Sequence, residues 1–209
     1  MSGPRAHATQ SKEANSRRAP MDDIPDEALL VAYGNGDMEA AGLLIRRLTP
    51  RVLSFATRML SGDAAEAEDV TQEAMVRLWR IAPDWRQGEA KVTTWLYKVV
   101  ANLCIDRLRK CRHQVVVDPV HDPADDAPGP TAQLIAADRL AALDAALREL
   151  PARQRQTVIL RHIEGLTNPE IARVMDIGVE AVESLTARGK RALKAALEGR
   201  KYELGYEDD

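Results

Sequence analysis

The stretch EGLTNPEIARVMDIGVEAVESLTARGKRALKAAL, residues 164–197, carries the sharpest local signal in the chain. Its first part predicts a short helix that Thr167 or Asn168 can cap. Pro169 suits an early helical position, where its missing N–H is harmless, and Glu170 complements the helix dipole. The triplet DIG, residues 176–178, then predicts a tight turn before a second helix. This order of cap, helix, turn and helix is typical of a helix-turn-helix.

The apolar residues of this stretch recur at helical spacing, which predicts a shared core between the two helices. We expect Gly178 to adopt the backbone conformation that other residues resist in the turn. The residues expected to face inward are Ile171, Ala172, Met175, Ile177, Val182, Leu185 and Leu193.

The opposite face of the second helix combines polar, small and basic side chains, as a helix that enters the major groove does. Arg188, Lys190, Arg191 and Lys194 would attract phosphates. An ordinary amphipathic hairpin with a solvated basic face remains the alternative. The candidate DNA-reading residues are Thr167, Glu180, Ala181, Glu183, Ser184, Ala187, Arg188, Lys190 and Arg191.

Upstream of the motif, a leucine pattern from Ala132 to Leu150 predicts a further helix, and Pro151 predicts the start of another. Residues 132–200 therefore form a predicted four-helix domain. Residues 113–131 contain several prolines, four aspartates and no Lys or Arg, which indicates a flexible acidic linker.

A first helical domain is predicted over residues 21–112. Its helices begin near Asp26, near Asp37 and near Asp63, and a fourth follows the loop 84–89. Pro50 lies within the second of them and either kinks it or is tolerated by a bend. In the fourth helix we expect Trp95 to face the core, with Lys91, Thr94, Lys98 and Arg107 outward.

The composition favours an all-α protein, because aliphatic residues and Ala dominate the 209 residues while aromatics make up only 4%. The formal net charge of -3 hides a strong segregation of charge. The charged residues of 77–112 are mostly basic, whereas residues 63–73 carry five acids and no base. Local patches rather than the total charge decide nucleic-acid binding.

No apolar run approaches the length that a membrane span needs, and the N-terminus lacks a signal-peptide core, so a cytoplasmic location is expected. Residues 1–20 and the acidic residues 201–209 read as tails. Cys104 and Cys111 lie too far apart on one helix to form a disulfide. With His113 they offer only three metal ligands, so no metal and no cofactor are expected, and a metal sensor is the weaker reading.

Two further segments, AEDVTQEAMVRLWR (67–80) and TTWLYKVVANLCIDRLRK (93–110), closely resemble region 2 of sigma-70-type factors. LPARQRQTVILRHIEGLTNPEIARVM (150–175) and the helix after it resemble region 4. Because no large domain separates the two, the chain resembles the extracytoplasmic-function (ECF) group. The resemblance implies a non-enzymatic stress-response regulator that binds core RNA polymerase and directs transcription initiation at particular promoters.

The resemblance also implies roles for individual residues. The acidic third helix would bind the clamp helices of the largest polymerase subunits through Asp69, Val70, Gln72 and Glu73, although a solvated, dipole-compensating helix start explains the same acids. The fourth helix and its preceding loop would trap an unstacked base of the minus-10 element and hold its phosphates. The candidates are Trp85, Lys91, Thr94, Lys98, Asn102, Arg107, Arg109 and Lys110. Tyr97 and Trp79 are expected to be structural.

The helix-turn-helix would read the minus-35 element, yet it departs from the family pattern. Gly178 stands where a Ser cap is frequent, and Glu183 and Leu185 stand where basic residues are common. Glu183 either accepts a hydrogen bond from a cytosine amino group or repels unsuitable phosphates. The linker, Asp118 to Asp126, either mimics RNA charge in the polymerase cleft or is a plain tether.

An anti-sigma factor is the expected regulatory partner, and membrane contact is expected only through such a partner where it is membrane-bound. A sigma-like decoy that sequesters an anti-sigma factor is the rival function. Such mimics usually carry a receiver domain, for which this chain has no room. An enzyme is not expected, because no nucleophile, base and orienting group form a set.

Overall fold

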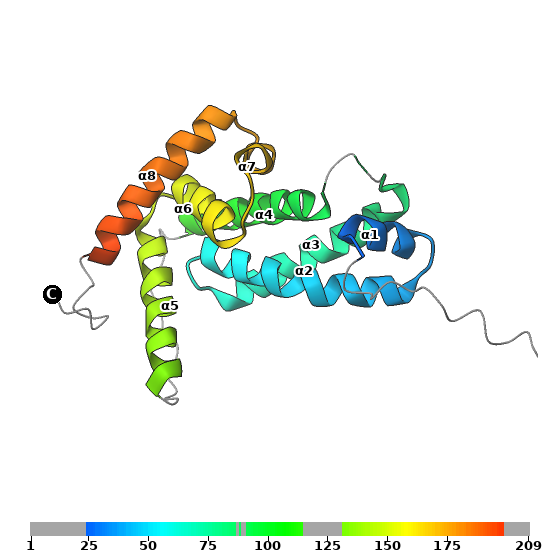
Figure 1. Ribbon diagram of the computed structural model, residues 1–209, viewed down its shortest axis with the longest axis horizontal. Helices are drawn as coiled ribbons and strands as arrows, with labels where there is room; N and C mark the ends of the chain where they lie inside the picture. Colours follow the sequence, from blue (N-terminus) through cyan, green and yellow to red (C-terminus); the bar gives the residue numbers. More distant parts are fainter. Residues whose placement is uncertain (1–23, 87, 89–90, 115–130, 199–209) are drawn as a thin grey trace, which may run out of the picture.

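The computed structural model describes residues 24–86, 88, 91–114 and 131–198, and these residues form helices and no strand. The all-α prediction is confirmed. The first domain contains four α-helices and a 3₁₀ turn: α1 (Asp26–Gly34), α2 (Met38–Met59), α3 (Ala64–Ile81), η2 (Ala82–Asp84) and α4 (Val92–Gln114). The second contains four α-helices and a π turn: α5 (Thr131–Glu149), α6 (Ala152–Val158), η3 (Ile159–Ile163), α7 (Asn168–Met175) and α8 (Val179–Glu198). Figure 1 shows α2, α3 and α4 lying lengthwise, with α5 and α8 at one end.

Aspartates fix the starts of two helices in the first domain. The Asp37 carboxylate accepts the backbone N–H of Glu39 at 2.9 Å, and the Asp63 carboxylate accepts that of Glu66 at 3.0 Å. Each satisfies an N–H that the helix itself cannot pair. Helix α2 continues through Pro50 without interruption.

The core of the first domain is largely aliphatic, with one fully buried aromatic pair at its centre. Phe55 on α2 and Tyr97 on α4 pack edge to face with ring centroids 5.2 Å apart, and both are buried. Trp79 packs against Tyr33 with ring centroids 4.8 Å apart, which fits the structural role expected of Trp79. Burial of each large side chain stabilises the fold by about 1.5–3 kcal/mol relative to exposure.

The turn of the helix-turn-helix has a different residue in the left-handed conformation from the one expected. Asp176 adopts φ 55° and ψ 51°, whereas Gly178 does not have a positive φ. Aspartate tolerates this region better than most residues because its short polar side chain can bond locally. The expectation for Gly178 was therefore wrong, although Ile171, Ala172 and Val182 are buried as predicted.

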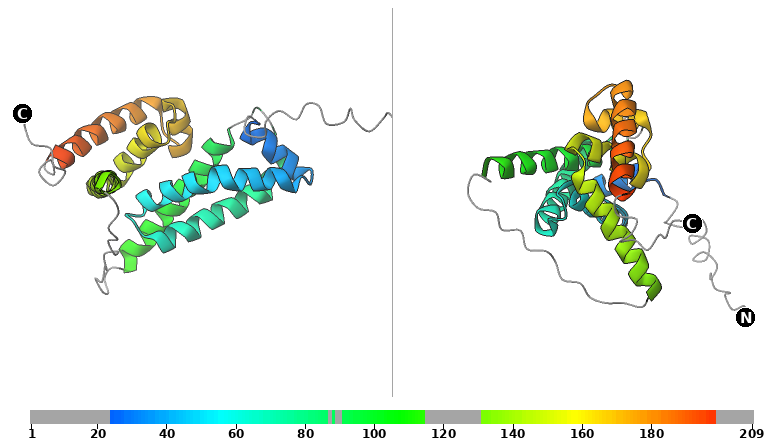
Figure 2. Two further views of the ribbon diagram at one scale, coloured as in Figure 1. Left: turned by 60° about the horizontal axis from the view of Figure 1, so that its bottom comes forward. Right: turned by 90° about the vertical axis from the view of Figure 1, so that its left-hand side faces the viewer.

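The two domains lie side by side, with α7 packed on α4 and with α5 and α6 against the end of α2 (Figure 2). The predicted linker, 113–131, lies almost wholly outside the described residues, as do the tails 1–20 and 201–209. Among the described residues, none of the helices combines the length and the hydrophobicity of a transmembrane segment.

Candidate nucleic-acid interface

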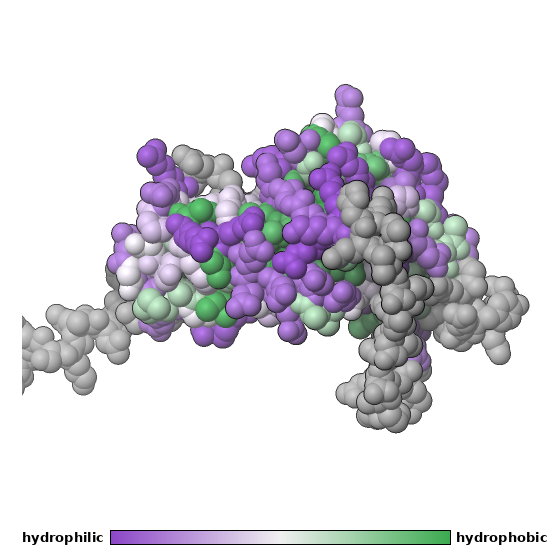
Figure 3. Space-filling model, turned by 180° about the vertical axis from the view of Figure 1, so that it is seen from behind, coloured by the Kyte–Doolittle hydropathy of each residue, from purple (hydrophilic) through white to green (hydrophobic). Residues whose placement is uncertain are grey.

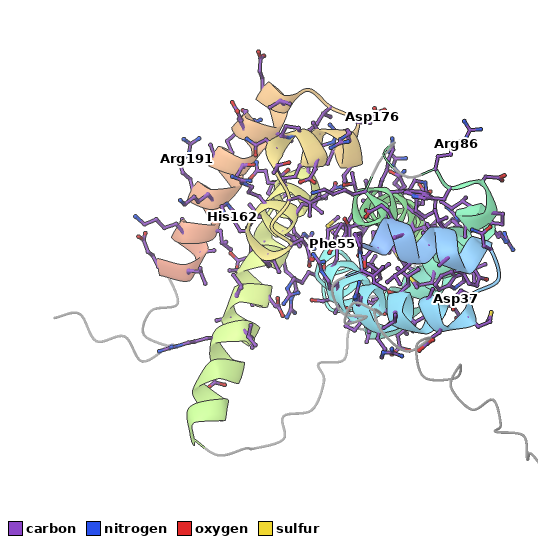
Figure 4. All side chains as sticks on the ribbon, turned by 45° about the vertical axis from the view of Figure 1, so that its right-hand side comes forward. Asp37, Phe55, Arg86, His162, Asp176 and Arg191 are labelled. Carbon is purple, nitrogen blue, oxygen red and sulfur yellow. The ribbon has the colours of Figure 1, made fainter. Side chains whose placement is uncertain are left out.

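The recognition helix α8 presents its polar face to solvent. All nine residues proposed to read the minus-35 element are exposed, including Thr167 at the start of α7. Figure 4 shows Arg191 on α8 and Asp176 at the turn. Val182, buried completely, and Gly189 lie on the opposite side of α8 and hold it to the domain. The periodicity of α8 therefore separates a packing face from a face free to enter a groove.

Helix α7 is held by the carboxylate of Glu170. One carboxylate oxygen of Glu170 accepts hydrogen bonds from the backbone N–H of Thr167 at 2.8 Å and from the Thr167 hydroxyl at 2.7 Å. Lys91 Nζ, from the first domain, lies 2.7 Å from the other carboxylate oxygen. These hydrogen bonds, that of Lys91 first, lower the pKa of Glu170 to about 2.

Asn168 connects α7 to the recognition helix. Its amide nitrogen donates to the Glu183 carboxylate at 3.5 Å, so the exposed acid has one positioning contact.

His162 lies in the π turn before α7. Burial together with the charges of Lys190 and Arg161 lowers the pKa of His162, which keeps that imidazole neutral near pH 7.

The proposed minus-10 residues, on the basic helix α4 and just before it, differ in exposure and in their partners. Four of them, Lys98, Asn102, Arg109 and Lys110, are exposed. Lys91 is exposed but paired with Glu170, and Trp85 is half-buried with its ring edge to face against Trp95, centroids 6.4 Å apart.

Two residues of α4 do not lie as expected. Thr94 is only 4% exposed, so the prediction that it faces outward was wrong in this conformation. Arg107 turns to α3, where its guanidinium lies 2.6 Å from Glu66 and 3.7 Å from Glu73. Because two carboxylates of its own domain bind Arg107, this side chain connects α4 to α3 and is not free to bind a phosphate.

The acidic helix α3 leaves Asp69 and Gln72 exposed, whereas Val70 is completely buried. The expectation that Val70 contacts a partner was wrong, because its position belongs to the core stripe. Glu73 is half-buried and also binds Arg77 at 2.6 Å.

A groove between α2 and α3 is the feature that sequence reasoning missed. It has a volume of about 420 Å³ and a mostly apolar lining. Ile45 and Val76 are 46% and 40% exposed, although each is a large apolar residue. Both lie off the apolar stripes of their helices, and that off-phase position was the available signal. The lining residues are Ile45, Thr49, Leu53, Glu68, Thr71, Gln72, Met75, Val76 and Trp79.

Hydrophilic side chains predominate on the face opposite to that of Figure 1, where small apolar patches lie among charged and polar residues (Figure 3). Among the described residues no group of three His, Cys, Asp or Glu side chains could hold a metal ion. An exposed helix-turn-helix and a basic helix, with an acidic helix beside an apolar groove, are the features of a helical DNA-binding protein that also offers a surface to a protein partner.

Comparison with known proteins gives the family. The sigma-70 region 2 family matches residues 44–114, and the sigma-70 region 4 family matches residues 140–193. The chain is 32% identical to the ECF RNA polymerase sigma factor SigM of Mycobacterium tuberculosis over 174 residues, which cover 82% of this chain and 84% of SigM. It therefore belongs to the ECF group of the sigma-70 family and is an alternative sigma factor, a regulator of transcription.

Two solved structures are similar in fold. One is that of CnrH in complex with the cytosolic domain of CnrY, with a TM-score of 0.61 and 25% identity, covering 83% of this chain and 97% of CnrH. The other is that of the sigma factor RpoE in complex with the anti-sigma factor NepR from Bartonella quintana, with a TM-score of 0.58 and 21% identity, covering 78% and 97%.

Proposed function

We propose that this sigma factor binds core RNA polymerase through its first domain, residues 21–112, and directs initiation at a restricted set of promoters. The polymerase surface consists of the groove between α2 and α3, which Gln72 lines, together with exposed Asp69 on α3. An apolar groove beside acidic and polar groups fits a partner helix with apolar and basic faces. Helix α4 binds the minus-10 element. In the second domain, residues 132–200, helix α8 binds the minus-35 element.

The observation that carries this proposal is the placement of basic and acidic side chains on different exposed helices, basic on α8 and α4 and acidic on α3. Arg188, Lys190 and Arg191 line the outer face of α8, and the minus-10 face of α4 keeps Lys98, Arg109 and Lys110 in solvent. DNA phosphates attract both faces by counterion release, whereas the exposed acids of α3 would be repelled from DNA. The acidic face is thereby left to a protein partner.

An anti-sigma factor is the proposed regulator. Support comes from the RpoE neighbour, which was solved bound to the anti-sigma factor NepR. The groove between α2 and α3 offers such a protein the same apolar surface that polymerase would use. A protein that acts on core polymerase and promoter DNA would work in the cytoplasm.

Run-off transcription tests the proposal. Core polymerase free of other sigma factors is mixed with the purified chain and a library of genomic promoter fragments. We expect transcripts from a small subset of fragments, and none without the chain. A protein that binds an anti-sigma factor but never core polymerase would instead be the decoy, and the proposal would be wrong.

A further inference from the structure

An acid lies on the face of α8 that the proposed function gives to promoter DNA. Helix α8 begins at Val179, so Glu183 is its fifth residue, and the side chain of Glu183 is exposed. Further along the helix, Arg188, Lys190 and Arg191 are exposed as well. DNA phosphates attract those basic side chains and repel a carboxylate. The presence of Glu183 among them therefore needs a physical reason of its own.

Helix stability does not supply that reason. A negative charge stabilises the first turn of a helix, where Glu180 already lies, and the effect falls off beyond that turn. On a helix surface, residues three and four positions apart are neighbours. For Glu183 these neighbours are Val179, Glu180, Thr186 and Ala187. None of them is basic and Glu180 has the same charge, so α8 offers Glu183 no ion pair of its own.

One side chain outside α8 holds the carboxylate. The amide nitrogen of Asn168 donates to Oε1 of Glu183 at 3.5 Å. Asn168 is the first residue of α7, whose start is fixed by the capping box of Thr167 and Glu170. In the described part of the chain, no hydrogen bond or ion pair involves the other oxygen of Glu183, Oε2. The contact with Asn168 thus orients the acid and leaves one acceptor for a ligand.

Small side chains give this acceptor access to the base edges of a DNA groove. Ser184 and Ala187 lie beside Glu183 on α8, and both are exposed. Helix α8 itself lies on the outside of the molecule (Figure 1). In helix-turn-helix complexes the N-terminal residues of the recognition helix contact base edges in the major groove. A carboxylate at the fifth position is therefore placed to meet a base.

The chemistry of a carboxylate selects which base this is. A glutamate carboxylate only accepts hydrogen bonds, so it needs a donor on the base pair. In the major groove the donors are the N6 amino group of adenine and the N4 amino group of cytosine. The adenine donor lies between two acceptors, its own N7 and O4 of the paired thymine, and both repel a carboxylate. The cytosine donor has an acceptor on one side only, O6 of the paired guanine, so cytosine is the better partner.

We propose that Glu183 is a specificity-determining residue that accepts a hydrogen bond from the N4 amino group of a cytosine in the minus-35 element, and that Asn168 is its positioning residue. A base pair without a donor at that point leaves the carboxylate desolvated and unpaired, so it is rejected. The assignment rests on the proposed promoter role of α8. It does not require that polymerase binds the first domain.

Selection from a random duplex DNA library tests the assignment on the free, full-length protein. Duplexes retained at low salt, where phosphate attraction is strong, are sequenced for the parent, Glu183→Gln and Glu183→Ala. We expect one position at which the parent prefers cytosine by at least about fivefold. Alanine should remove this preference. Glutamine, which pairs with N6 and N7 of adenine, should turn it toward adenine, while the other positions keep their preferences.

Glu198→Gln is the matched control. It removes the same charge from an exposed position near the end of α8, about 22 Å along the helix from Glu183. We expect this variant to keep the cytosine preference, because only the overall attraction to DNA changes. Should Glu183→Gln bind every duplex more tightly and keep the base preferences of the parent, Glu183 only repels phosphates and the proposal is wrong. A parent without a cytosine-preferring position would overturn it as well.

The positioning role of Asn168 has a readout that a loss of stability would not give. Asn168→Ala should lower the cytosine preference at that one position, since the carboxylate is no longer held. In the Glu183→Ala background the same substitution should have no further effect on base preference. Thermal unfolding checks that each variant is folded. A folded Asn168→Ala protein with the preference of the parent would show that Asn168 does not position Glu183.

The selection involves no transcription, so the two proposals can fail separately. If core polymerase and the chain give no transcripts while the cytosine preference depends on Glu183, the proposed function is wrong and the base assignment stands. If transcripts appear and the preference does not depend on Glu183, only the base assignment is wrong.

Discussion

A β carbon at Gly189 would lie 2.6 Å from Cγ2 of Val158, so α8 contacts α6 with no space for a side chain. The same atom would lie 3.2 Å from the Gln154 carbonyl oxygen, which is backbone and cannot turn aside. Glycine inside a helix usually weakens it by about 1 kcal/mol relative to alanine. Here the close approach of the two helices, which fixes the recognition helix on its domain, requires it.

Gly189→Ala is therefore expected to lower the free energy of unfolding of the second domain by about 1–3 kcal/mol, because Val158 must shift in a packed core. Gly42→Ala is the matched control: its β carbon would meet only the Arg46 guanidinium at 3.5 Å, so this change should be neutral or stabilise by up to about 1 kcal/mol. Urea unfolding measures both. A Gly189→Ala protein as stable as the parent would contradict the close packing.

Local sequence signals predicted the elements well because each has a local physical cause. Asp37 and Asp63 cap the helices that follow them, and Pro151 precedes α6, where a missing N–H costs nothing. The apolar stripe of α8 placed Val182 inside and the basic residues outside. Helical periodicity needs no knowledge of the rest of the fold, which is why these predictions are confirmed.

The predictions that failed depend on what lies opposite a helix. Periodicity put Thr94 on an outer face, but its side chain is only 4% exposed, in a helix on which α7 packs. The basic pattern of α4 predicted that Arg107 binds a phosphate, but in the fold its guanidinium pairs with Glu66 of α3. The sequence of the turn favoured Gly178 for the left-handed position, yet Asp176 occupies it, since the register of a turn is decided by the two helices that it joins.

The two thiols should differ sharply in reactivity. Burial raises the pKa of the Cys104 thiol to about 12, only partly offset by the charge of Arg107, whereas Cys111 is exposed. At pH 8 the thiolate fraction of a group with that pKa is about 10⁻⁴, and access is closed as well. Titration with a chromogenic disulfide should detect one fast thiol in the folded protein and two in denaturant. Cys111→Ser should abolish the fast reaction; a second fast thiol in the native protein would contradict the burial of Cys104.

The cap of α7 should give the second domain a defined acid sensitivity. Lys91 first, and then the Thr167 backbone, lower the pKa of Glu170 from 4.5 to about 2. An acid with a depressed pKa stabilises the folded state above its unfolded pKa, and that stability is lost as the pH falls toward the folded pKa. The thermal unfolding midpoint of Glu170→Gln should therefore lie below that of the parent at pH 7, with the gap shrinking between about pH 4.5 and 2. A gap that does not change with pH would mean that the charge of Glu170 is irrelevant to stability.

Arg188 and Lys190 are expected to bind phosphates rather than to read bases. Alanine at either position should weaken binding to duplex DNA of any sequence and reduce the slope of log affinity against log salt by about 0.9 for each lost phosphate contact. Arg80→Ala removes the same charge from an exposed site on α3 and should leave the slope unchanged. Fluorescence anisotropy over a salt series measures it. A loss confined to one DNA sequence would instead assign these residues to base readout.

Val76→Asp should separate polymerase binding from folding. Val76 is 40% exposed in the groove between α2 and α3, so an added charge there costs little within the free protein. In a complex the same charge would be buried against an apolar partner, and we expect core polymerase to bind at least about tenfold more weakly. Met38→Asp makes the same change at an apolar residue that is 72% exposed outside the groove, and it should bind normally. Competition against a labelled sigma factor gives the affinities, and thermal unfolding confirms that both variants are folded. Equal binding by the two folded variants would remove the groove from the polymerase interface.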